Sequence, residues 1–141
     1  MKTYAVPHTS LEVSSVILGL MRIADMSDAD IRALFDAALD SGITVFDHAD
    51  VYGGTLHRCE ERFGAALKLS AADRSRIILQ SKVGIGKGFF DFSRERILKN
   101  VDGTLAALKT EPPRVYRRVI CSTTRRLHRV SSGLHRTPPL L

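Results

Sequence analysis

The chain has 141 residues, of which 44% are hydrophobic and 26% charged, which is typical of one globular domain without an apolar run long enough to span a bilayer. The N-terminal residues lack the apolar core of a signal peptide, and Cys59 and Cys121 follow neither disulfide nor metal-site spacing, so we expect a reduced, cytoplasmic protein with no membrane partner. The net charge of +6 comes from residues 112–141, which hold seven arginines and no acidic residue, whereas residues 1–111 carry a net charge of −1; specific nucleic-acid binding is therefore not expected.

The first elements predicted are a strand and a helix. Residues 15–23, "SVILGLMRI", form an apolar, β-branched run that is typical of a buried strand. A helix is predicted next, because Ser27 is suited to cap its first turn and Gly42 to follow its last. Between these two residues, apolar side chains recur at the spacing of one buried helix face: Ile31, Leu34, Phe35, Ala38 and Leu39.

The alternation of strand and helix continues along the chain. Residues 43–50, "ITVFDHAD", predict a second strand, residues 59–69 a second helix and residues 76–85 a third strand. A third helix is predicted after Ser93, with its apolar face formed by Ile97, Val101, Leu105 and Leu108. Because short links join these elements, the sequence predicts an α/β fold of three parallel βα units.

Polar side chains follow the second and third strands at the sheet edge where parallel α/β proteins carry their active sites. Asp47 ends the apolar part of the second strand, Tyr52 follows it, and Lys82 lies within the third. Lysine is rarely buried without a partner, and Asp47 can supply one. An ammonium group beside a tyrosine stabilises the phenolate form, so the hydroxyl can donate its proton to a carbonyl oxygen that gains negative charge. We call these three residues the proton-donating cluster.

The residues around this cluster have simpler interpretations. Strand alternation sends His48 to the side opposite Asp47, where it is either a substrate-facing residue at the rim or a hydrogen-bonded structural residue. Asp50 is predicted to cap the turn that follows the second strand. Glu60 and Glu61 stand early in the second helix, and the helix dipole explains two acidic residues at that position.

The alternating pattern stops after Thr110. Residues 111–141 hold four of the five prolines and one short apolar run, "VYRRVI", but no sustained helical or strand periodicity. We expect an irregular or disordered C-terminal tail. The chain is therefore divided into a body, residues 1–110, and a tail, residues 111–141.

Three separated motifs, "LGLMRI", "FDHADVYGG…CEERFGAAL" and "IILQSKVGI", resemble those of the aldo-keto reductases in order and spacing, over residues 1–110. The resemblance implies a (β/α)8 TIM barrel, of which this chain holds the first three βα units. It also implies NADPH-dependent reduction of a small-molecule aldehyde or ketone. Of the family's catalytic tetrad, Asp47, Tyr52 and Lys82 match the aspartate, the tyrosine that acts as general acid and the lysine that tunes it.

The fourth tetrad member, a histidine, has no matching position. Family members continue into a fourth strand that ends in "LLHRPD"-type residues, whereas His128 and His135 of this chain follow no apolar strand. The residues that bind NADPH in the family lie mostly in later strands, so no cofactor-binding residue is assigned. We expect a truncated chain of little or no activity, with its third strand at an open sheet edge and a tail that arises from a frameshift near residue 111.

Two other functions stay open at this point. A non-enzymatic βα fragment could bind polyanions or a protein partner through its arginine-rich tail, with an affinity that falls as salt rises. A different barrel enzyme could use Lys82 to form a Schiff base with its substrate.

Overall fold

The structure is a computed structural model that describes residues 1–86 and 88–109 and, for the backbone alone, residues 119–121. No helix in this part of the chain is long and apolar enough to cross a membrane. The elements follow one another as β1 (Thr3–Ala5), β2 (Glu12–Ser14), β3 (Ile17–Gly19), α1 (Asp28–Asp40), β4 (Val45–Asp47), α2 (Arg58–Leu67), α3 (Ala71–Ser75), β5 (Ile78–Ser81), β6 (Ile85–Gly86), β7 (Phe89–Phe90), α4 (Arg94–Ala107) and β8 (Val119–Cys121).

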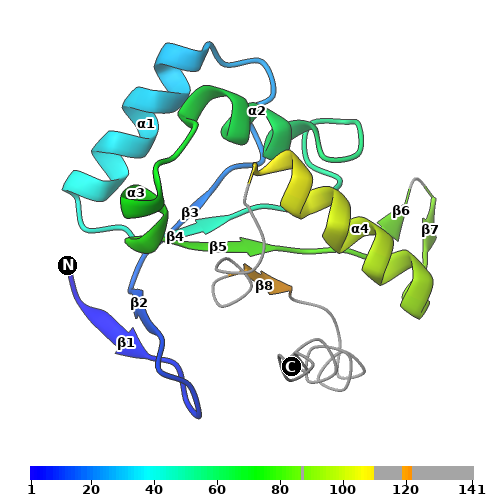
Figure 1. The fold of residues 1–141 in the computed structure, drawn as a ribbon, viewed down its shortest axis with the longest axis horizontal. Coiled ribbons are helices and arrows are strands. Elements are labelled where there is room, and N and C mark those ends of the chain that lie inside the picture. Colours follow the sequence, from blue (N-terminus) through cyan, green and yellow to red (C-terminus); the bar gives the residue numbers. More distant parts are fainter. Residues whose placement is uncertain (87, 110–118, 122–141) are drawn as a thin grey trace, which may run out of the picture.

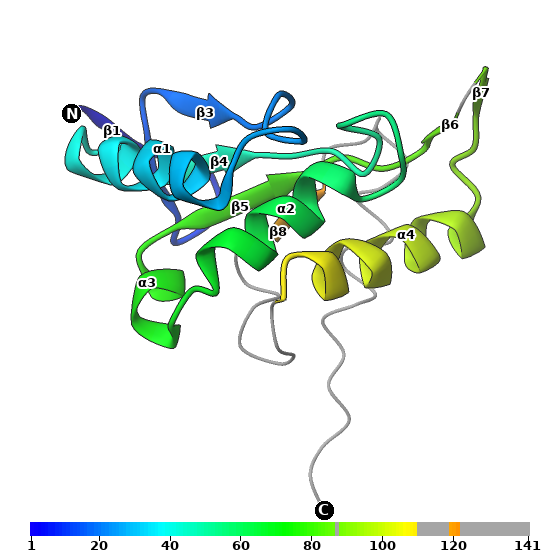
Figure 2. The same cartoon turned by 90° about the horizontal axis from the view of Figure 1, so that it is seen from above.

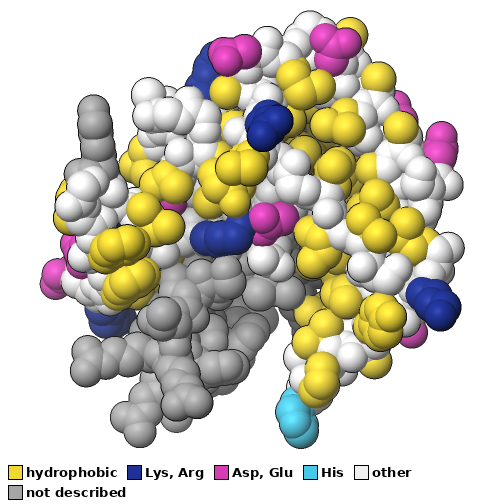
Figure 3. All heavy atoms as spheres, turned by 180° about the vertical axis from the view of Figure 1, so that it is seen from behind, with side chains coloured by type: hydrophobic (Ala, Val, Ile, Leu, Met, Phe, Trp, Pro, Cys, Tyr) yellow, Lys and Arg dark blue, Asp and Glu magenta, His cyan; other side chains and the backbone are white. Residues whose placement is uncertain are grey.

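A parallel sheet in the strand order β3-β4-β5-β8 forms the centre of the fold (Figure 1). Val45 of β4 is the register partner of Ile17 of β3 and of Ile78 of β5. The carboxyl ends of these three parallel strands therefore lie at the same edge of the sheet. Helices α1, α2 and α4 lie on one side of the sheet (Figure 2). From the other side, hydrophobic side chains occupy much of the described surface (Figure 3). The arrangement confirms the predicted α/β fold with parallel βα units.

Helices α1 and α4 begin at the predicted serine caps. Ser27 Oγ accepts a hydrogen bond from the backbone N–H of Asp30 at 3.1 Å, and Ser93 Oγ accepts one from the N–H of Arg96 at 3.3 Å. Each bond satisfies one of the N–H groups that a helix leaves without a partner in its first turn. Gly42 follows α1 with a φ of 80°, a left-handed conformation that glycine adopts without steric cost.

Three phenylalanines join the helices to the sheet. Phe46 of β4 lies 5.1 Å from Phe35 of α1 and 6.0 Å from Phe63 of α2, measured between ring centroids. All three rings are almost completely buried. Burying a large apolar side chain stabilises a fold by about 1.5–3 kcal/mol, so this contact fixes β4, the strand that ends in Asp47, against the helix layer.

The strands are shorter than the apolar runs that predict them. β3 covers only residues 17–19 of the predicted residues 15–23, and β5 covers residues 78–81 of the predicted residues 76–85. Loop residues such as Leu20, Ile23 and Val83 are also buried. An apolar run therefore predicts which residues are buried, but it does not show where the pairing between strands ends. The β1–β2 and β6–β7 hairpins and helix α3 are additions to the predicted set, and each is built from elements of two to five residues.

One stretch of the predicted irregular tail is a strand. Val119–Cys121 forms β8, which pairs in parallel with β5 through Leu79 and Val119. Over these residues β5, the predicted third strand, therefore has a neighbour. The prediction that this strand forms an open edge of the sheet is wrong. The sequence did not indicate β8 because its short apolar run is surrounded by arginine and proline. The other predictions for the tail, including those on His128, His135, the frameshift and polyanion binding, lie outside the described residues and stay predictions.

The contact between α2 and α4 gives a test of the packing. A Cβ on Gly64 of α2 would collide with the carbonyl oxygen of Ala107 and lie 3.0 Å from the backbone of Leu108. We expect Gly64→Ala to lower the free energy of unfolding by about 1–3 kcal/mol through overpacking, although alanine favours a helix over glycine by about 1 kcal/mol. Urea denaturation measures the change.

Gly19→Ala is the control for this substitution, because no atom of the described residues, apart from its two chain neighbours, lies within 4 Å of a Cβ added at Gly19. Its effect should stay within about 0.5 kcal/mol. A stabilised Gly64→Ala variant would contradict the close approach of the two helices.

Candidate active site

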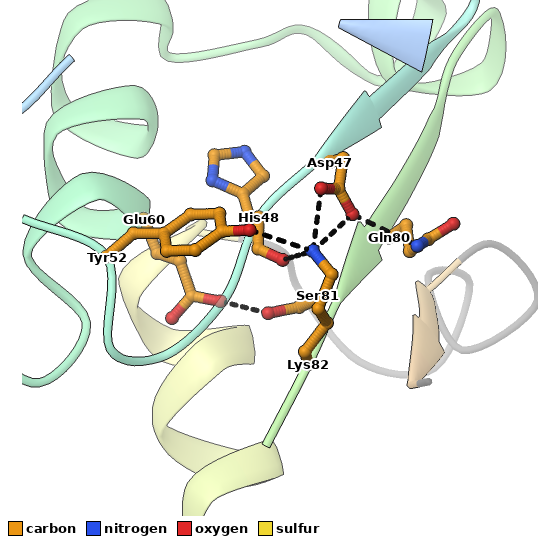
Figure 4. Close-up of polar contacts among 7 residues, drawn as sticks. All are labelled: Asp47, His48, Tyr52, Glu60, Gln80, Ser81 and Lys82. Atoms are coloured by element: carbon orange, nitrogen blue, oxygen red, sulfur yellow. Dashed lines mark hydrogen bonds and ion pairs between the residues drawn. The ribbon is translucent and has the colours of Figure 1, made fainter. Parts of the chain in front are cut away.

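The structure brings the three residues of the proton-donating cluster together. Asp47 ends β4, and Lys82 directly follows β5. The Nζ atom of Lys82 lies 2.6 Å from both carboxylate oxygens of Asp47 and 3.1 Å from Oη of Tyr52 (Figure 4). It also donates to the carbonyl oxygen of His48 at 2.9 Å. Three residues thus accept from an ammonium group that has three N–H donors.

Strand pairing explains why these side chains meet. Asp47 and Gln80 are register partners on β4 and β5, and the Gln80 amide Nε2 donates to Asp47 Oδ1 at 3.0 Å. Gln80 precedes Lys82 by two residues. Because side chains alternate along a strand, the two side chains lie on the same face of the sheet. The register of the parallel sheet therefore places the ammonium group of Lys82 beside the carboxylate of Asp47.

The surroundings of Lys82 keep it protonated. Burial acts to lower its pKa, but the hydrogen bonds to Asp47 and Tyr52 together with the negative charge of Asp47 raise the pKa above its ordinary value of 10.5. A protonated lysine is not a nucleophile, so this environment argues against the Schiff base that the sequence left open. The ammonium also lies 5.0 Å from the centroid of the Tyr52 ring, within the range of a cation–π interaction.

The loop after β4 turns Tyr52 towards Lys82. The backbone N–H of Asp50 donates to the carbonyl oxygen of Lys82 at 3.1 Å, and the N–H of Tyr52 donates to the carbonyl oxygen of Ala49 at 3.1 Å. Gly53 follows with a φ of 90°, and a Cβ there would lie 3.0 Å from side chains of α2. A glycine at this position lets the chain turn after Tyr52 and pass close to the first residues of α2.

His48 does not have the substrate-facing role that the sequence suggested as one alternative. Its ring points away from the ammonium, is completely buried and packs edge-on against Phe63, with the ring centroids 4.9 Å apart. Neither ring nitrogen has a hydrogen-bond partner among the described residues. The substrate-facing interpretation is wrong, because strand alternation sends this side chain into the apolar layer between the sheet and the helices. Burial lowers the pKa of His48 to about 4, which keeps the imidazole neutral.

Two carboxylates bond to α4, although the sequence suggested local roles for them. The sequence predicts Asp50 as a turn cap, but its Oδ2 accepts a hydrogen bond from Asn100 Nδ2 at 2.6 Å. The helix dipole was sufficient to explain Glu60, but its side chain is fully buried and accepts from Ser81 Oγ at 2.6 Å and Thr104 Oγ1 at 3.2 Å. These partners stand 21 to 50 residues away along the chain, so no local pattern reveals them.

The family model described as the aldo/keto reductase family matches residues 15–117. The chain belongs to the aldo/keto reductase family. Uncharacterized oxidoreductase YcsN of Bacillus subtilis is 39% identical over 113 residues, which cover 72% of this chain and 37% of that protein. Oxidoreductase YdhF of Escherichia coli is 36% identical over 110 residues, or 71% of this chain and 36% of that protein. The resemblance carried by the three sequence motifs is confirmed.

A solved structure of the family shares the fold. The holo form of aldo-keto reductase AKR11C1 from Bacillus halodurans aligns with a TM-score of 0.65 and 31% identity, over 78% of this chain and 37% of that one. This aldo/keto reductase chain therefore spans little more than a third of the length of these relatives. The curated relatives YcsN and YdhF are both named as oxidoreductases, and the family generally uses NAD(P)H.

The buried imidazole of His48 should make the fold sensitive to acid. Its pKa is about 4 in the folded chain and 6.5 in an exposed histidine, so the unfolded state takes up a proton first as pH falls. The stability that His48 contributes is therefore complete above pH 6.5 and is lost between pH 6.5 and about pH 4. Over this window the loss amounts to about 3 kcal/mol.

His48→Leu removes the titrating group and isolates this effect from that of the carboxylates. Urea denaturation across the same pH window should show a smaller loss of stability in His48→Leu than in the unchanged chain. An equal pH dependence of the two proteins would contradict a buried, neutral His48.

Proposed function

We propose that this chain supplies the proton-donating side of a reductase that converts an aldehyde or ketone to an alcohol with NADPH. The observation that carries the proposal is the ammonium of Lys82, which bonds both oxygens of Asp47 and Oη of Tyr52 at once. When bound, NADPH would supply the hydride that forms the new C–H bond at the carbonyl carbon. The hydroxyl of Tyr52 gives its proton to the carbonyl oxygen, which forms the O–H bond of the product.

Each residue of the cluster has its own part in the proton transfer. Lys82 donates a hydrogen bond to Tyr52 Oη, which leaves the phenolic hydrogen free to point at a substrate oxygen. As the proton leaves, the ammonium stabilises the negative charge that develops on Oη. Asp47 orients the ammonium and balances its charge, so the cluster brings no net charge to an uncharged carbonyl group.

The cluster suits the reacting end of a nicotinamide cofactor. A nicotinamide ring in its reduced form and a carbonyl group are both uncharged, and the Asp47–Lys82 pair is neutral as a whole. Phosphate groups need cationic or backbone N–H donors, and the ammonium of Lys82 is already engaged by Asp47. We therefore assign the cluster to the carbonyl and the nicotinamide, and no residue to the phosphates.

We also propose that the 141-residue chain by itself reduces carbonyl compounds slowly or not at all. The described sheet has four strands, whereas a (β/α)8 barrel closes around eight, so the described residues supply only part of a barrel mouth. Fluorescence titration with NADPH and an aldehyde-reduction assay on the purified chain test this expectation. Stoichiometric NADPH binding together with rapid turnover would contradict it.

The role of Tyr52 can be tested in a chimeric enzyme. Residues 1–109 would replace the matching segment of the Bacillus halodurans aldo-keto reductase, and NADPH oxidation would be followed with a panel of aldehydes and ketones. We expect turnover by the chimera and a fall in kcat of about 100- to 10,000-fold in Tyr52→Phe, because the variant keeps the ring and loses the proton donor.

Tyr4→Phe is the matched control, because Tyr4 is exposed on β1 and this substitution should leave kcat unchanged. A folded Tyr52→Phe chimera with undiminished kcat would contradict the role of Tyr52 as proton donor. A folded chimera that binds NADPH but reduces no carbonyl compound would contradict the proposed reaction itself.

A further inference from the structure

A buried carboxylate lies behind the proton-donating cluster. Glu60, in the first turn of α2, is fully buried. Its Oε1 accepts a hydrogen bond from Ser81 Oγ at 2.6 Å (Figure 4), while its Oε2 accepts one from Thr104 Oγ1 at 3.2 Å and lies 2.6 Å from His57 Nδ1. Glu60 therefore joins the start of α2, the end of β5 and the last turn of α4.

Glu60 is charged in spite of its burial. Burial acts to raise its pKa, but the hydrogen bonds from His57 and Ser81 together with charge interactions with His48 and His57 hold the pKa below its ordinary value of 4.5. The bond to Glu60 in turn raises the pKa of His57, which favours the protonated imidazole and an ion pair with Glu60. A buried charge is costly unless its hydrogen-bond donors stay in place. The hydroxyl of Ser81 is one of those donors and is therefore held firmly.

The backbone around His57 is adapted to this ion pair. His57 has a φ of 63°, a left-handed conformation that residues other than glycine rarely adopt. Its ring lies against Gly103 of α4, where a Cβ would collide with Nε2 of His57. Both features place Nδ1 beside the carboxylate of Glu60, so the position of this carboxylate is set from α2 and from α4.

Ser81 connects this network to the cluster, because it is the residue before Lys82. Side chains alternate here, so Ser81 faces the helices while Lys82 faces the opposite side of the sheet. The backbone of Lys82 has a second tie of the same kind. Its carbonyl oxygen accepts from the N–H of Asp50 at 3.1 Å, and the side chain of Asp50 is bonded to Asn100 of α4.

We propose that Glu60 is a positioning residue: by holding Ser81, it keeps the ammonium of Lys82 in the proton-donating cluster. Glu60 takes no part in the proton transfer and acts only through the end of β5. The inference rests on the proposed function, in which Lys82 assists proton donation through its hydrogen bond to Tyr52.

A pair of isosteric substitutions tests this role. Glu60→Gln removes the charge and keeps the shape, and Glu61→Gln makes the same change at the exposed neighbouring position. NMR of the Lys82 side chain, assigned by the loss of its signal in Lys82→Arg, measures how fast the ammonium protons exchange with water. We expect exchange about tenfold faster or more in Glu60→Gln and unchanged exchange in Glu61→Gln.

The backbone N–H of Ile78, which donates to the carbonyl oxygen of Thr44 at 2.8 Å, reports opening of the sheet as a whole. Faster exchange at Lys82 alone supports positioning by Glu60. Unchanged exchange at Lys82, or equal acceleration at Lys82 and Ile78, would overturn it, since the carboxylate would then serve stability only.

Ser81→Ala keeps the proposal testable if Glu60→Gln does not fold. This variant removes only the hydroxyl, while His57 and Thr104 still bond the carboxylate of Glu60. It should show the same selective acceleration at Lys82, and its absence would overturn the role of Glu60. Because this exchange is measured without turnover, a failure here is distinguishable from a failure of the Tyr52→Phe test.

Discussion

The ammonium group of Lys82 is the constraint on which the rest of the described structure depends. Held by both oxygens of Asp47 and bonded to Tyr52, it connects the ends of β4 and β5 with the loop between β4 and α2. A partly buried charge is costly without such acceptors. The strand register, the turn that begins at Ala49 and the glycine that follows Tyr52 are all needed to place these acceptors around the ammonium group. The same contacts leave a phenolic hydroxyl beside a fixed positive charge, at the sheet edge where parallel α/β proteins bind their ligands.

Strand β4 and the residue after it show how one short segment serves two layers. Asp47 faces the cluster, whereas Phe46 and His48 enter the layer between the sheet and the helices. The same division holds at the end of β5, where Ser81 bonds Glu60 on the helix side and Lys82 bonds Asp47 on the other. The apolar core and the buried polar network thus lie behind the cluster and limit the movement of the residues that form it.

Local signals predicted the parts of this structure that local physics decides. Ser27 and Ser93 cap their helices because a serine hydroxyl reaches N–H groups of its own first turn, and the βα alternation predicted the parallel order that brings Asp47 to Lys82. Contacts between residues that are far apart along the chain could not be predicted from these local signals. Glu60 meets Thr104 from 44 residues away, and β8 forms beside β5 in a stretch whose composition predicts no strand. The expected pair of Asp47 and Lys82 at the ends of neighbouring strands suggested Tyr52 as a proton donor, and the family motif supplied the tetrad into which it fits.

A double-mutant cycle between Asp47 and Lys82 tests most directly whether this pair holds the cluster together. Asp47→Asn and Lys82→Met each leave one charge without its partner, whereas the double variant removes both charges. From urea denaturation of the four proteins we predict a coupling energy of about 1–3 kcal/mol, so that the double variant loses less stability than the sum of the single losses. Additive losses, with a coupling energy below about 0.5 kcal/mol, would contradict the central place given to this pair.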